Sequence, residues 1–292
     1  GTTAYAFCYD TSDDNACSNW VETGTTSQAI LEGLSESTTY YWQVRATNSL
    51  DTIYADGAET AFWSFTTGNL LVDTWTEMTA TAEWSARENH TSVTLPDGSI
   101  VLMGGDDGVK RNDVWRSTNQ GATWTQMTAA AEWTARSSHS SVVLPDGSIV
   151  LMGGHNGSSP TDDVWRSIDQ GATWIEMTDD APWAARNAHT SVALRDGSIV
   201  LMAGYTGTSY KNDVWRSTDQ GATWTQMTAA AEWAGRTSTT SVALPDGSIV
   251  LMGGYAGSIF KNDVWRSTNQ GASWTQMTAA AGWAARTSPS SV

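Results

Sequence analysis

From about residue 70 onward, the chain alternates short apolar segments with polar turns. One unit reads HTSVTL, PDG, SIVLMGG, a variable segment, NDVWRS, a Ser-containing turn and TWTQMT, which predicts four short strands and no long helix. SIVLMGG has four consecutive apolar residues instead of alternation, so we expect an inner strand that is covered on both faces. The P-D-G sequences predict tight turns, because proline presets φ and glycine accepts the positive φ that follows. The pattern therefore predicts four-stranded β-sheets.

This pattern recurs with a period of about 50 residues. The repeat is marked by one tryptophan column, at Trp75, Trp124, Trp174, Trp224 and Trp274. An arginine column keeps the same step, at Arg87, Arg136, Arg186, Arg236 and Arg286. Self-similarity at this period indicates a propeller or a solenoid. Four strands per unit and a twice-covered strand favour a propeller.

A turn of pattern S-x-[DN]-x-G-x-[ST]-W follows the third expected strand of each unit. It begins at Ser117, Ser167, Ser217 and Ser267, and it resembles the Asp box of bacterial sialidases. Its Asp or Asn can accept hydrogen bonds from the amides of the turn, while its glycine supplies backbone freedom. A catalytic site needs one singular set of groups, whereas this turn is present in every unit. We therefore interpret it as structural.

The combined pattern of R-x-x-H-[ST]-S, a glycine pair, D-V-W and a further Trp is similar to the kelch repeat. The resemblance covers roughly residues 70–292 and implies an all-β protein. It predicts a β-propeller of four-stranded kelch-like blades, with four full blades plus partial ones. In kelch propellers, the variable loop and the loop that joins successive blades open on one face, where partners bind.

Residues 1–69 form a different module. Residues 31–48, LEGLSESTTYYWQVRATN, resemble the later half of a fibronectin type III domain, with Tyr40 at the position of the tyrosine corner. YAFCYDT and SNWVET resemble its middle strands, and FWSFTTG its last strand. The first two strands of that fold are absent. The prediction is therefore a truncated fibronectin III-like β-sandwich ahead of the propeller.

Residues that recur in each unit are expected to support the fold. All nine methionines fall in two columns and are predicted to fill the core. One arginine per blade is expected to pair with the backbone or with an Asp such as Asp113, the alternative being an arginine triad for an anionic sugar. His90, His139 and His189 share one column and are expected to be hydrogen-bonded, the alternative being a metal site. We predict no catalytic residue and no metal ligand in these columns.

The loops that differ between units are the candidate binding residues. After the glycine pair they read DDGVKR, HNGSSPTD, YTGTSYK and YAGSIFK, and one joining loop carries an Asp pair. Exposed aromatic side chains there are expected to act as anchors for a partner. The alternative is that these loops vary because nothing constrains them. The candidate ligand-binding residues are Asp106, Asp107, His155, Asn156, Asp179, Asp180, Tyr205, Tyr210, Tyr255 and Phe260.

Charge and cysteine content restrict the setting. The formal charge of −16 disfavours nucleic-acid binding, and no apolar run is long enough for membrane insertion. Cys8 and Cys17 are expected to form one disulfide, which indicates a secreted, extracellular or cell-surface protein. Asn89 and Asn156 begin N-glycan acceptor triplets. No cofactor is expected, although the acidic turn at Asp10, Asp13 and Asp14 is a candidate calcium site.

These features predict a non-catalytic adhesion or assembly protein. The expected partner is a protein or a glycan bound at the propeller face, or further copies of the chain in an oligomer or filament. The alternative is a sialidase-like or other glycan-processing enzyme whose site lies in irregular loops or in missing sequence. Both modules look cut in this sequence, which we expect to reflect a longer native chain or, as a second possibility, strands supplied by a neighbouring copy.

Overall fold

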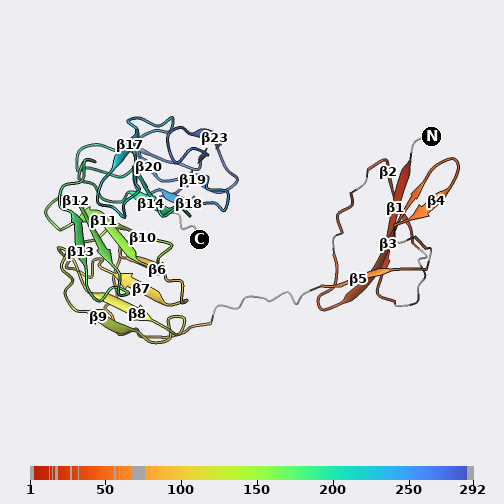
Figure 1. The fold of residues 1–292 in the computed structure, drawn as a ribbon, viewed down its shortest axis with the longest axis horizontal. Helices are drawn as coiled ribbons and strands as arrows, with labels where there is room; N and C mark the ends of the chain where they lie inside the picture. Colours follow the sequence, from red (N-terminus) through yellow and green to blue (C-terminus); the bar gives the residue numbers. More distant parts are fainter. Residues whose placement is uncertain are drawn as a thin grey trace. The chain divides into compact units, whose positions relative to one another are not determined.

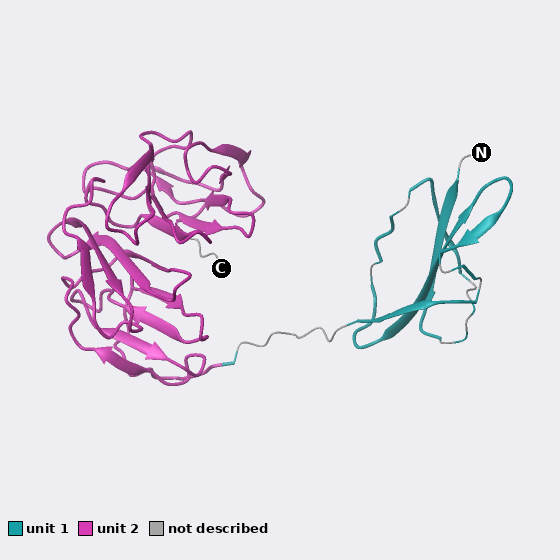
Figure 2. Cartoon of the chain, in the orientation of Figure 1, with its two compact units in different colours: residues 1–76 teal, residues 77–292 magenta. Residues whose placement is uncertain are grey.

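The computed structural model consists of strands, turns and loops, without a helix in the described ranges. The chain divides into two compact units, residues 1–76 and residues 77–292 (Figure 2). No described segment forms a helix that is long and apolar enough to cross a membrane. The structure describes residues 3–12, 14, 16, 19–26, 28–31, 33–55, 57–58, 60–67 and 76–287.

The described part of the first unit is one antiparallel sheet in the order β2-β1-β3-β4, with β5 also paired to β3 (Figure 1). The predicted pairing of YAFCYDT with the following segment is present as the β1–β2 hairpin. A short strand, β4, was not expected. The described residues of this unit therefore form a single sheet layer. The strands are β1 (Ala4–Asp10), β2 (Val21–Gly24), β3 (Thr39–Thr47), β4 (Thr52–Tyr54) and β5 (Trp63–Thr66).

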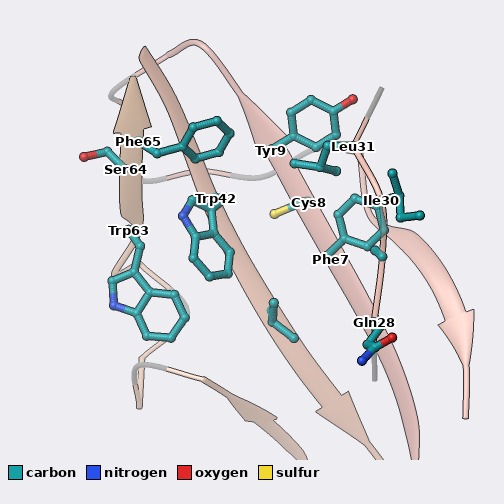
Figure 3. Close-up of a pocket in the computed structure, with 12 residues that line it drawn as sticks. Phe7, Cys8, Tyr9, Gln28, Ile30, Leu31, Trp42, Trp63, Ser64 and Phe65 are labelled. Carbon is teal, nitrogen blue, oxygen red and sulfur yellow. The ribbon is translucent and has the colours of Figure 1, made fainter. Parts of the chain in front are cut away.

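Aromatic side chains hold this sheet together. The ring of Tyr40 is buried and stacks on Phe65, with 5.7 Å between the ring centroids. The backbone N–H of Ser35 donates a hydrogen bond of 2.8 Å to the Tyr40 hydroxyl, which ties the preceding segment to β3. One face of the sheet carries a groove of about 890 Å³ between Trp42, Trp63 and residues 28–31 (Figure 3).

The second unit consists of four antiparallel sheets that follow one another around a curve (Figure 1), which confirms the predicted four-stranded blades. Blade 1 contains β6 (Thr91–Thr94), β7 (Ile100–Met103), β8 (Val114–Ser117) and β9 (Thr125–Thr128). Blade 2 contains β10 (Ser140–Val143), β11 (Ile149–His155), β12 (Pro160–Ser167) and β13 (Ile175–Thr178). Blade 3 contains β14 (Thr190–Ala193), β15 (Ile199–Met202), β16 (Val214–Ser217) and β17 (Thr225–Thr228). Blade 4 contains β18 (Thr240–Ala243), β19 (Ile249–Met252), β22 (Val264–Ser267) and β23 (Thr275–Thr278), with a small hairpin of β20 (Tyr255–Ala256) and β21 (Ile259–Phe260).

The apolar strand of each blade is second from the centre. In β11 and β15 the four residues Ile-Val-Leu-Met are fully buried, so the predicted cover on both faces is confirmed. It is an inner strand of its sheet, as expected, while the first strand of each blade lies nearest the centre. Consecutive blades contact each other through their first strands, in the order β6, β10, β14 and β18. These first strands are richer in Ser and Thr because one side of them faces a groove instead of a neighbouring blade.

Blades 2, 3 and 4 also pack their Ser-containing turns on the preceding blade. A Cβ atom added at Gly171 would lie 2.7 Å from Cγ1 of Val114, and one at Gly221 would lie 2.6 Å from Cγ1 of Val164. Glycine is required there because a side chain would enter the neighbouring blade. Next to the turn, the rings of Trp133 and Trp174 meet edge to face, with 6.0 Å between their centroids. Such edge-to-face pairs add to the burial that joins two blades.

Backbone hydrogen bonds join the blades near the first strands. The N–H of Ser138 donates to the carbonyl of Asn89, that of Ala188 to Ser138, and that of Ser238 to Ala188, each at 2.8 Å. All four residues have left-handed backbone angles, with φ between 49° and 54°. Left-handed backbone is unfavourable for residues other than glycine, so the surrounding blades must hold it in place.

Candidate binding surface

Four members of the arginine column, Arg87, Arg136, Arg186 and Arg236, form ion pairs through buried side chains. Arg186 is buried, and its two terminal nitrogens donate to the two carboxylate oxygens of Asp213 at 2.7 and 2.8 Å. Burial acts to raise the pKa of Asp213, but the hydrogen bonds and charge of Arg186, together with the hydrogen bond from Trp215 and the charge of Lys211, leave the pKa below its usual value. The same pairing joins Arg87 to Asp113, as predicted. These arginines are therefore occupied inside their blades.

The histidine column lies beside a groove of about 450 Å³ that the first strands form. Nε2 of His139 is 2.8 Å from Oγ1 of Thr91, and Nε2 of His189 is 2.8 Å from Oγ of Ser140, so these side chains are hydrogen-bonded, as predicted. Burial, followed by the charge of the nearby arginine, lowers the pKa of each of these two histidines to about 3. They are uncharged at neutral pH, and hydroxyl groups give the groove its polarity.

The Ser-containing turns are closed by their own side chains. In blade 3, Oγ of Ser217 accepts a hydrogen bond from the N–H of Gly221, and Oδ1 of Asp219 accepts one from the N–H of Thr223, each at 2.9 Å. The turn joins β16 to β17, between the third and fourth strands of its blade. Its polar groups are thus used within the turn, which agrees with a structural role.

The variable loops form one hairpin per blade, between the second and third strands. The facing residues are Asp106 and Lys110 in blade 1, His155 and Pro160 in blade 2, Tyr205 and Tyr210 in blade 3, and Tyr255 and Phe260 in blade 4. The same backbone arrangement therefore presents an ion pair, a His-Pro pair and two aromatic pairs. We call the surface formed by these four hairpins the loop face.

Aromatic side chains form a continuous row across blades 3 and 4 of the loop face. The centroid distances are 5.0 Å from Tyr205 to Tyr210, 5.9 Å from Tyr210 to Tyr255 and 5.3 Å from Tyr255 to Phe260. The ring of Phe260 is 52% exposed, and the neighbouring Ile259 is 57% exposed. The structure thus brings four of the predicted site residues into one cluster, which we call the aromatic row.

The loop face of blade 1 is charged. Nζ of Lys110 lies 2.6 Å from Oδ2 of Asp106. Asp107 accepts hydrogen bonds from Arg111 and from Ser85, and these bonds hold its pKa well below the usual value. The charges of Asp106 and Asp107 are therefore already paired within the loop.

The predicted Asp pair of blade 2 lies in the joining loop, apart from the aromatic row in sequence. Asp179 and Asp180 are exposed. The N–H of Ala181 donates a hydrogen bond of 3.3 Å to the carbonyl of Asp162, so the joining loop lies close to the end of the variable loop. Burial, and then the charge of Asp180, raise the pKa of Asp162. These three carboxylates give this part of blade 2 an acidic character.

The other candidate residues are distributed over both units. Asn89 is exposed, and Asn156 lies at the tip of the β11–β12 hairpin. Cys8 is buried in β1, but Cys17 lies outside the described residues, so the disulfide stays a prediction. Asp13 is likewise outside them, while Asp10 and Asp14 accept hydrogen bonds from nearby backbone amides. Among the described residues, no group of three or more His, Cys, Asp or Glu could hold a metal ion.

Sequence reasoning missed three residues of the loop face. Lys110, Pro160 and Ile259 lie on the returning side of the hairpins, where Tyr210 and Phe260 were predicted but these three were not. A comparison of the repeats at both sides of the variable loop would have found them, because these positions differ as strongly as their partners.

Four-stranded blades that contact through their first strands define a β-propeller class of protein. Residues 90–291 match the KLHDC2/KLHL20/DRC7 Kelch-repeats domain. The chain belongs to the kelch-repeat family, whose domains generally act as non-catalytic scaffolds for protein interactions. A comparison with curated proteins finds no match.

Proposed function

We propose that the kelch unit is a non-catalytic interaction module that binds a protein partner through the aromatic row. The supporting observation is the continuous contact of four rings, with Phe260 and Ile259 exposed at its end. Aromatic anchors of this kind carry much of the binding free energy in protein interfaces. The charges of blade 1, which blade 2 separates from the aromatic row, are paired internally and are less available to a partner.

The charge of the chain suggests the chemistry of the partner. The net charge is −16, and Asp179 and Asp180 are exposed in blade 2. Complementary charge increases association rates and specificity, so a partner with an apolar centre and basic residues around it fits best. The aromatic row supplies the apolar contact in this proposal, and the acidic side chains supply the surrounding attraction.

We further propose an extracellular role in adhesion or assembly, with a fibronectin III-like first unit. The expected Cys8–Cys17 disulfide supports an oxidising compartment. The pairing of β1 with β2, the pairing of β3 with both β1 and β5, and the hydrogen bond between Ser35 and the Tyr40 hydroxyl support the fibronectin III-like fold. The S-x-[DN]-x-G turns are proposed to be Asp-box turns that serve the fold.

Peptide selection followed by matched variants tests the protein-binding proposal. Peptides would be selected from a random displayed library on the immobilised protein, and their affinities measured by calorimetry. Phe260→Ser and Tyr210→Ser are expected to weaken binding at least about tenfold, as loss of a central anchor does. Arg195→Ala is the control, because its turn lies at the other end of β15 from the variable loop.

Two results would contradict the proposal. One is selected peptides that bind the two aromatic variants as tightly as the original protein. The other is a glycan array on which the protein binds sugars with the aromatic row required, because this would favour the glycan alternative. The folding of each variant is checked by tryptophan fluorescence, since the tryptophans lie between blades.

A further inference from the structure

The tip of the β11–β12 hairpin carries His155-Asn156-Gly157, the only Asn-Gly dipeptide in the chain. Asparagine side chains are lost when the backbone nitrogen of the next residue attacks their Cγ atom. Glycine as the next residue favours this reaction, because it has no side chain to shield its nitrogen. Gly157 is exposed, so water can reach the hairpin tip.

The hairpin places two further groups around this dipeptide. The N–H of Gly157 donates a hydrogen bond of 3.0 Å to Nδ1 of His155, so an imidazole nitrogen faces the proton that the attacking nitrogen must lose. Oδ1 of Asn156 accepts hydrogen bonds of 2.9 Å from the N–H groups of Ser158 and Ser159. Two donors on one carbonyl oxygen stabilise the negative charge that develops there during an attack on its carbon.

We propose that Asn156 is a site of intramolecular deamidation, with His155 as the general base. The nitrogen of Gly157 forms a bond to Cγ of Asn156 while its proton passes to Nδ1 of His155. The C–N bond of the side-chain amide then breaks, and ammonia leaves with that proton. Water opens the resulting succinimide at either carbonyl, which gives aspartate or isoaspartate. No oxidant or cofactor is required.

The product changes the loop face. Aspartate or isoaspartate adds a negative charge at a position that is neutral in the original chain, between the ion pairs of blade 1 and the aromatic row. Isoaspartate also inserts one extra carbon atom into the backbone of the hairpin. Both changes alter the surface that the variable loops present.

Blade 1 provides an internal control. In the same hairpin position, the N–H of Gly108 donates a hydrogen bond of 3.0 Å to Oδ1 of Asp106. The residue before it is Asp107, whose carboxylate is held by Arg111 through bonds of 2.9 and 2.7 Å. A carboxylate is a poor electrophile, and these bonds keep it ionised. Isoaspartate is therefore expected at Asn156 and not at Asp107.

The test uses the full chain produced in a host that does not add N-glycans. The protein is incubated at neutral pH, digested with trypsin and analysed by mass spectrometry of residues 137–166, with an isoaspartate-specific methyltransferase as a second readout. The expected result is faster deamidation of Asn156 in the folded chain than in the same chain unfolded in guanidinium. In the unfolded chain, the contacts of His155, Ser158 and Ser159 are absent.

The matched variant is His155→Tyr. Tyrosine occupies this position in blades 3 and 4, where the Tyr205 hydroxyl donates a 2.6 Å hydrogen bond to the carbonyl of Gly207, so the hairpin accepts it. We expect this variant to fold and to deamidate at least about tenfold more slowly, a smaller effect than the 10²–10⁴ typical of enzymatic bases, because the tip is open to solvent. A folded chain that reacts no faster than the unfolded chain would overturn the proposal. An unchanged rate in a folded His155→Tyr protein would overturn it equally.

Discussion

Replacement of Asp162 by asparagine is expected to stabilise the protein. In the other three blades this position is asparagine. The Nδ2 group of Asn112 donates to the carbonyls of Ala131 and Trp133 at 3.0 and 3.2 Å, and Asn212 and Asn262 make the equivalent pairs of bonds. A carboxylate cannot donate, so Asp162 cannot make either bond.

The backbone at this position agrees with that difference. The N–H of Ala181 lies 3.3 Å from the carbonyl oxygen of Asp162, whereas the same bond is 2.9 Å at Asn112 and 2.8 Å at Asn212. One hydrogen bond contributes about 1 kcal/mol, so two bonds give a gain of about 2 kcal/mol for Asp162→Asn. For a unit of this size, the melting temperature should rise by about 4 to 8 °C.

The gain depends on pH in a defined direction. Burial, and then the charge of Asp180, raise the pKa of Asp162 in the folded protein, so the carboxylate destabilises the fold at neutral pH. That penalty disappears as the pH falls through the raised pKa and below the ordinary value of 3.8. The advantage of Asp162→Asn is therefore largest at neutral pH and shrinks in acid.

Thermal and urea unfolding, followed by tryptophan fluorescence at several pH values, measure this gain. The reverse change, Asn212→Asp in blade 3, is the matched control and is expected to lose a similar free energy of unfolding. A melting temperature unchanged by Asp162→Asn at neutral pH, or a gain that stays constant down to acid pH, would refute the reasoning.

Three further predictions concern the packing of the blades. Gly171→Ala should reduce the free energy of unfolding by about 1 to 3 kcal/mol more than Gly121→Ala does. Both glycines have φ near 90°, but only a Cβ at position 171 would enter a neighbouring blade. Equal losses of stability in urea unfolding would argue against this packing. His189→Thr, which copies blade 4, should reduce the loss of stability that occurs as the pH falls from 6.5 to about 3. The reason is that His189 is held uncharged in the fold and takes up a proton on unfolding. Parallel profiles of stability against pH for the variant and the original protein would contradict this prediction. Arg186→Met should reduce the free energy of unfolding by about 3 to 5 kcal/mol, because it leaves a buried carboxylate unpaired. Arg216→Met, at a more exposed ion pair, should reduce it by less than about 1 kcal/mol. Similar unfolding midpoints for the two variants would exclude this difference.

The sequence predicts the blades and much of their internal chemistry. Repeated spacing is sufficient for this, because residues that recur at the same step along the chain occupy equivalent positions in successive blades. The pairing of Arg87 with Asp113 followed from one arginine and one aspartate per blade, and the structure contains that bond. The turns at Ser117 and its equivalents were placed correctly between the third and fourth strands.

The order of strands within a blade could not be obtained from hydrophobicity alone. The apolar strand was expected to be an inner strand with cover on both faces, and this cover comes from the neighbouring blades, but its pattern did not show which strand lies nearest the centre. The strand at the centre is more polar, because Ser140 and Thr190 stand beside the groove. The contact of Tyr210 with Tyr255 was also beyond sequence reasoning, since these residues belong to different blades and meet only when the blades are packed.

The backbone bonds that run from Asn89 through Ser138 and Ala188 to Ser238 have an evolutionary consequence. The joint between two blades uses N–H and C=O groups that every residue except proline possesses, and three different amino acids occupy these four positions. A duplicated blade would bring its own backbone N–H and C=O groups for the bond to the next blade, so no further substitution would be needed to form that bond. Selection is then free to change the hairpin tips separately, as the ion pair, the His-Pro pair and the aromatic pairs show.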